Sequence, residues 1–118
     1  MTTADWLEAT LNELIKRANE GNLFIGTQGR SPPGPVVVTH DEDRETLDDI
    51  RIGLGLGSVR TMPNCMTGPK LAWVAYDEEA IKALILLIPY LRKQKGREAM
   101  IKKSCAGRLI NQWKIDHK

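Results

Sequence analysis

The chain has 118 residues, of which 42% are apolar and 27% are charged, and this is enough for one domain with an ordinary hydrophobic core. Its net charge is only +2, so a basic surface has to come from local clustering. No apolar run is long enough to span a membrane, and the acidic start is unlike a signal peptide, so we expect a soluble protein with no membrane partner. Two cysteines, Cys65 and Cys105, make neither a metal cluster nor a disulfide framework, which suits a reducing compartment.

The first predicted element is an amphipathic helix over residues 3–20. Thr3 is its expected cap, and Gly21 is its expected stop. A strand over residues 22–27 follows directly. The apolar face of this helix consists of Leu7, Leu11, Leu14, Ile15 and Ala18.

The middle of the chain predicts a second helix between two hairpins. A loop rich in glycine and proline over residues 28–35 leads into a β-branched strand over 36–39. The next helix starts between Asp41 and Glu45 and stops at Gly55 or Gly57. Its apolar face is Leu47, Ile50 and Leu54. Strands are predicted over 58–61 and 70–76.

Two more helices complete the predicted order. Asp77 is the expected N-cap of the first, and Pro89 is its expected end. Its apolar face is Ile81, Leu84, Ile85 and Ile88. In the last helix, after Gly96, apolar residues recur at every fourth position. They predict a buried face of Ile101, Cys105, Leu109 and Trp113, with lysines and arginines on the outer faces.

This order predicts an α+β fold in which residues 1–118 form a single αββαββα domain. Two neighbouring hairpins make a four-stranded antiparallel sheet. Helices cover one face of the sheet, and Trp73 packs beneath it. The other face is left open.

One stretch carries a more specific pattern, Leu-x-x-Ile-x-x-x-Leu-Gly-x-Gly-x-Val over residues 47–59. A strand with Trp73 follows, and then Ile88-Pro89-Tyr90-Leu91 with basic residues up to Lys95. The pattern resembles the second half of a LAGLIDADG homing endonuclease domain, over about residues 20 to 105. The resemblance implies a saddle-like sheet whose open face holds a nucleic acid.

The same resemblance implies a metal-binding acid at Glu20, which ends the first helix just before Gly21. If the chain is catalytic, Glu20 would hold Mg²⁺, and otherwise no cofactor is expected. A solvated glutamate at the helix end is the alternative. The family pairs two such helices through small residues, whereas this chain has Leu14, Ile15, Lys16 and Arg17 in that region. These bulky and charged residues therefore oppose close pairing of the two first helices in a homodimer.

Two other positions match groups near the family's active site. His40, at the end of the second strand, is a candidate general base, with an ordinary surface histidine as the alternative. The family's lysine five residues after the proline falls on Gln94 here. A shift of one residue makes Lys95 or Lys93 the counterpart, and Lys95 is our candidate catalytic lysine.

Side-chain alternation along the strands selects the residues that would face a nucleic acid. The basic run that begins at Arg92 adds candidate phosphate contacts. Ordinary surface charge is the alternative for each residue taken alone. The predicted nucleic-acid-binding residues are Asn22, Gln28, Arg30, Ser58, Arg60, Lys70, Arg92 and Lys93.

These features predict a nucleic-acid-binding protein of the LAGLIDADG type whose cleavage activity is weak or lost. It would act on RNA, such as an intron, or as a structural component of a ribonucleoprotein such as an organellar ribosome. The alternative is an active, homodimeric, site-specific DNA endonuclease that uses Mg²⁺. A protein-interaction module has no specific support. Mitochondria, chloroplasts, bacteria and phages are the candidate settings.

Overall fold

The computed structural model describes residues 2–29, 33–63 and 68–117. Arg30 and Cys65 therefore lie outside the described residues. In this part of the chain no helix is both long and apolar enough to cross a membrane. The elements are α1 (Thr3–Asn19), β1 (Leu23–Thr27), β2 (Pro35–His40), α2 (Arg44–Leu54), β3 (Ser58–Met62), β4 (Lys70–Tyr76), α3 (Glu78–Lys93) and α4 (Arg97–Asp116).

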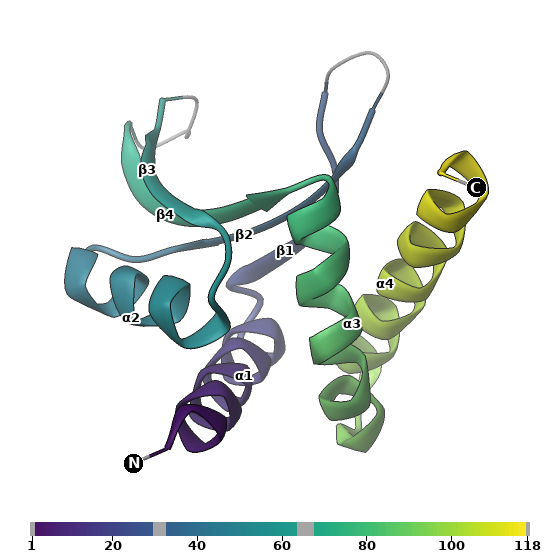
Figure 1. Ribbon diagram of the computed structural model, residues 1–118, viewed down its shortest axis with the longest axis horizontal. Coiled ribbons are helices and arrows are strands. Elements are labelled where there is room, and N and C mark those ends of the chain that lie inside the picture. Colours follow the sequence, from purple (N-terminus) through teal and green to yellow (C-terminus); the bar gives the residue numbers. More distant parts are fainter. Residues whose placement is uncertain (1, 30–32, 64–67, 118) are drawn as a thin grey trace.

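The four strands form one antiparallel sheet in the order β1-β2-β4-β3. Each hairpin pairs within itself, and the two hairpins join along β2 and β4. All four helices lie on one side of the sheet, and the strands curve so that the hairpins rise on the opposite side (Figure 1). The predicted α+β class and the four-stranded antiparallel sheet are confirmed.

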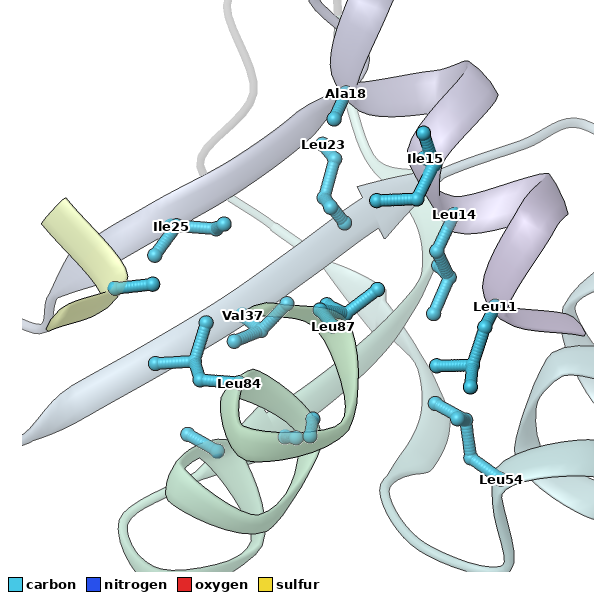
Figure 2. Close-up of a cluster of buried hydrophobic side chains, with 14 of the residues drawn as sticks. Leu11, Leu14, Ile15, Ala18, Leu23, Ile25, Val37, Leu54, Leu84 and Leu87 are labelled. Atoms are coloured by element: carbon cyan, nitrogen blue, oxygen red, sulfur yellow. The ribbon is translucent and has the colours of Figure 1, made fainter. Parts of the chain in front are cut away.

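The core lies between the sheet and the helices, because alternate strand residues point to that side. Val37 from the middle of the sheet lies against Leu84 and Leu87 of α3, and Leu11 of α1 lies close to Leu54 of α2 (Figure 2). Trp73 is fully buried in the same cluster. Every helix and strand supplies at least one residue to this cluster or to the side chains packed against it.

The turn from α2 to β3 depends on two glycines, as predicted. Gly55 and Gly57 have φ of 73° and 85°, a region that residues with a Cβ rarely adopt. The Trp73 indole nitrogen donates a hydrogen bond of 3.1 Å to the Leu56 carbonyl. A Cβ on Gly57 would lie 2.6 Å from Cε2 of that indole. The bare backbone at Gly57 therefore lets the chain pass over the ring.

Two predicted helix ends differ from the structure, and a third agrees in position but not in its hydrogen bonding. Thr2, rather than Thr3, caps α1, because Thr2 and Asp5 form a reciprocal capping box. Asp77 is the N-cap of α3 by position, but its φ is 55° and its side chain makes no capping hydrogen bond. The prediction that Pro89 ends α3 is wrong, since the helix continues to Lys93. Proline removes the bond to the carbonyl of Ile85, four residues earlier, and both Ile85 and Pro89 lie on the exposed side of the helix.

The buried faces of α3 and α4 also differ in part from the predicted ones. Ile85 and Ile101 are about half exposed, at 51% and 50%. In α4 the buried residues are Ala99, Ala106 and Ile110. A row spaced by four residues drifts around a helix that has 3.6 residues per turn. The predicted row in α4 is therefore exposed at Ile101 and only partly buried at Cys105, Leu109 and Trp113.

Candidate nucleic-acid interface

The face of the sheet opposite the helices carries a second, smaller apolar cluster. Its buried members are Val36, Val38, Ala72 and Val74, with Met62 and Tyr76 packed against them. All of these residues belong to strands. In the described part of the chain, no helix contributes to the cluster, and we call this surface the open face.

Aromatic and cationic side chains stand at the two sides of the open face. Phe24 on the edge strand β1 is 52% exposed. On β3, the Arg60 guanidinium lies 5.3 Å from the centre of the Tyr76 ring and donates a 3.3 Å hydrogen bond to the Ser58 hydroxyl. The cation and the aromatic ring attract each other through the ring quadrupole. Ser58 and Arg60 thus lie on the face that alternation predicts.

A cleft of about 940 Å³ opens where the end of α1 meets the end of β2 and the start of β4. Four predicted site residues line it, and they come from segments far apart in the sequence. These residues are Glu20, Asn22, His40 and Lys70. The rest of the lining includes three acidic and two basic residues, namely Glu13, Asp41, Glu42, Lys16 and Arg17.

Arg17 forms the inner wall of the cleft and is only 8% exposed. Its guanidinium donates to Glu13 Oε1 at 3.1 Å, Thr39 Oγ1 at 3.2 Å, the His40 carbonyl at 3.1 Å and Asp41 Oδ2 at 2.7 Å. Such charge-assisted bonds hold a buried guanidinium in place. The expectation that Arg17 obstructs a helix pairing surface is therefore wrong, because this side chain turns onto its own sheet. Lys16 remains exposed.

Asp41 and His40 have shifted proton affinities in this cleft. The backbone N–H of Asp43 and the Arg17 side chain together hold the pKa of the Asp41 carboxyl below its usual range. Burial, and then the positive charge of Lys70, lower the pKa of His40. His40 is thus neutral near pH 7, which is the form that accepts a proton or a hydrogen bond.

Glu20, the predicted metal ligand, is the exposed C-cap residue of α1. The described residues contain no group of three His, Cys, Asp or Glu side chains that could hold a metal ion.

The end of α3 lies beside the end of α1. The Asn19 amide donates a 3.0 Å hydrogen bond to Gln94 Oε1, so a neutral amide stands next to Glu20. Lys95 is exposed in the connection between α3 and α4 and is not among the described residues that line the cleft. Arg92 and Lys93 are exposed in the last turn of α3, with Lys93 Nζ 5.7 Å from the centre of the Tyr90 ring.

The structure separates Gln28 from the cleft. Gln28 follows β1 at the other end of the strand, where its amide lies 3.5 Å from Asp77 Oδ1. Phe24 and Tyr76 are not among the residues that the sequence predicts to bind nucleic acid. Whether an aromatic residue on a sheet is exposed depends on its neighbours, and alternation along one strand does not identify them.

Comparisons with known proteins found no match: no family model fits the chain, and no curated protein or solved structure resembles it significantly.

Proposed function

We propose that this chain binds nucleic acid on the open face of its sheet. The observation that carries the proposal is the convergence of polar and basic side chains from separate segments at the edges of one uncovered face. Arg60 lies on β3, Lys70 begins β4, and Asn22 precedes β1. A cationic rim around an uncovered sheet suits a polyanion, because its phosphates can contact the rim while its bases lie over the strands.

The proposed fold family is that of the LAGLIDADG homing endonucleases. Two αββ units in succession, a central β2–β4 pair and a curved open sheet support this assignment. RNA, alone or within a ribonucleoprotein, is the proposed partner, and duplex DNA is the alternative. The strand centres support RNA, because Val36, Val38 and Val74 offer no hydrogen-bonding groups for reading the edges of paired bases.

In this proposal cleavage is weak or absent. Glu13 and Asp41, the carboxylates nearest Arg17, are both ion-paired with it. Glu20 is left without a described set of partner ligands for Mg²⁺ on its own chain. The second candidate is a homodimeric DNA endonuclease, and one observation favours it: Glu20 and His40 line the same cleft.

The proposal is tested by titrating labelled duplex DNA and labelled single-stranded RNA with the protein at several salt concentrations. Fluorescence anisotropy gives the affinity and its salt dependence. Arg60→Ala and Lys70→Ala should each weaken binding and lower the salt slope by about one unit for each phosphate that the variant no longer binds. Replacing Arg92 and Lys93 by alanine tests the end of α3 in the same way.

Lys82→Ala is the matched control, because Lys82 is exposed on α3 and pairs with Glu78 at 3.5 Å on the helix side of the sheet. It removes the same charge without touching the open face, so it should leave the affinity unchanged. The proposal fails if the wild-type protein binds neither probe. It also fails if Arg60→Ala and Lys70→Ala behave like Lys82→Ala.

A further inference from the structure

Phe24 differs from the other exposed apolar residues of this chain. Seven large apolar residues are exposed in the described part, and the other six lie on helices. Phe24 alone lies on the sheet, in β1, where it pairs with Val38 of the open face. The backbone that carries this aromatic ring is therefore held in a paired strand.

Gly26 determines how the Phe24 ring lies. The two residues point to the same side of β1. The tip of the ring, Cζ, is 2.7 Å from the place where a Cβ of residue 26 would be. The ring thus extends along the strand and occupies the space that a side chain at position 26 would fill. With 52% of the residue still exposed, much of the ring remains available to a ligand.

The surface beside the ring is low and apolar. One row across the sheet consists of Phe24, Val38, Val74 and Ser58, in register from β1 to β3. No side chain larger than valine stands between the two ends of this row, which are three strand spacings, or about 14 Å, apart. Arg60 lies two residues after Ser58 on β3, and its guanidinium carbon is 5.3 Å from the centre of the Tyr76 ring.

We infer that Phe24 is a stacking residue for an unpaired nucleobase, and that the ligand of the open face is a single strand. This inference rests on the proposed function and specifies its partner. In a duplex the faces of the bases are hidden and only the edges are presented, and edges are read by hydrogen-bonding side chains. In a single strand the faces are free, and aromatic side chains on a sheet bind them.

The inferred site divides the binding energy between two kinds of contact. The Phe24 ring and the valine floor take a base by its face. Arg60 and Lys70, at the rim, take the phosphates and carry the salt dependence. Loss of Phe24 should therefore lower the affinity without changing the salt slope, and this pattern differs from that expected for the rim residues.

The test uses four labelled probes: oligo(U) and oligo(dT) of about 12 nucleotides, and the RNA and DNA duplexes that each forms with its complement. Phe24→Leu keeps an apolar side chain and removes the ring, whereas Phe24→Tyr keeps the ring. We expect Phe24→Leu to weaken binding of at least one single strand about tenfold, with an unchanged salt slope. Phe24→Tyr should bind within about twofold of the wild-type protein. Comparing oligo(U) with oligo(dT) distinguishes RNA from DNA.

Two controls separate stacking from misfolding and from general stickiness. Thermal unfolding of Phe24→Leu should resemble that of the wild-type protein, because the ring is half exposed. Ile115→Ala removes an apolar side chain that is 62% exposed on α4, and it should leave binding unchanged.

The outcomes distinguish this inference from the proposed function. Tight binding of duplex that depends on Arg60 and Lys70 but not on Phe24 would overturn the stacking role and leave the proposed function intact. Equal losses of affinity for duplex and single strand in Phe24→Leu would likewise overturn it. If the wild-type protein binds none of the four probes, both proposals fail.

Discussion

The two αββ units of the chain hold the connection between the helix and the first strand with different side chains. In each unit, a buried residue on the second strand bonds to a carbonyl in the connection between the helix and the first strand. Thr39 Oγ1 donates to the Asn22 carbonyl at 2.8 Å, and Trp73 Nε1 donates to the Leu56 carbonyl at 3.1 Å. Thr39 and Trp73 are also paired neighbours across β2 and β4. We call each of these bonded connections a joint, and the two joints therefore meet at the centre of the sheet.

The space behind each joint is filled differently. In the first unit the Arg17 guanidinium fills it and is bonded to Thr39 and Asp41. In the second unit the Trp73 indole fills it and packs against the bare backbone of Gly57. The first joint is polar and borders the cleft. The second, which we call the apolar joint, is filled by the fully buried indole, and the Glu79 carboxylate accepts a 2.9 Å hydrogen bond from the Gly57 N–H on its exposed side. A protein with two similar units can thus keep one for packing and use the other to build a site.

Gly57→Val should be the most destabilising change, because it disturbs the apolar joint in two ways. Valine is strained at a φ of 85°, and its Cβ would collide with the Trp73 indole. We expect the free energy of unfolding to fall by about 3 kcal/mol, as measured by urea denaturation. Gly29→Ala is the control, since nothing lies within 4 Å of a Cβ added there. A decrease below about 1 kcal/mol would show that the second joint can rearrange.

Arg17→Met should have the second largest effect, because it removes the buried cation from the polar joint. The change leaves Thr39 Oγ1 and the His40 carbonyl without their arginine donor. We expect a decrease of about 2 kcal/mol in the free energy of unfolding. Lys16→Met, at the exposed neighbouring position, should change the stability little. If Arg17→Met is as stable as the wild-type protein, then apolar packing alone stabilises both joints, and the buried guanidinium adds nothing to the stability of the first.

Asp41 should give the polar joint a dependence on pH that the apolar joint lacks. Because the pKa of Asp41 is lowered in the folded state, its contribution is present above about pH 4 and is lost as the pH falls through the lowered pKa. We expect Asp41→Asn to cost about 1 kcal/mol at pH 6 and progressively less as the pH falls below about 4. Trp73→Phe, which removes the indole hydrogen bond, should cost the same throughout this pH range. Parallel pH profiles for the two variants would contradict this difference.

The sequence was informative where a local pattern decides the structure. The extended run with Trp73, Val74 and Tyr76 predicted the bounds of β4, and apolar spacing predicted the buried Leu47, Ile50 and Leu54 of α2. Positive φ at Gly57 was predictable because few residues other than glycine adopt it. The same local reasoning failed at Pro89, where only tertiary contacts of α3 show that the helix continues.

The polar parts of the candidate site were less predictable. Alternation correctly placed Arg60 on the open face, but it provided no sign that Glu20, His40 and Lys70 would line one cleft. Arg17 was misjudged because its partners Thr39 and Asp41 are more than 20 residues away in sequence. Within α1 alone, an arginine between Lys16 and Ala18 looks like a surface residue. Only the packing of α1 on β2 shows that its charge is buried.

The smallest expected effect concerns His40, which connects the polar joint to the open face. Its carbonyl accepts from Arg17, while its ring lines the cleft with Lys70. Burial and the charge of Lys70 both lower the pKa of His40, burial being the larger cause. Lys70→Met removes only the charge, so the pKa should rise but stay below the ordinary value of about 6.5. A titration of the His40 ring signals by NMR measures both values, and Lys82→Met serves as the charge-matched control. An unchanged pKa would mean that Lys70 points away from the ring in solution.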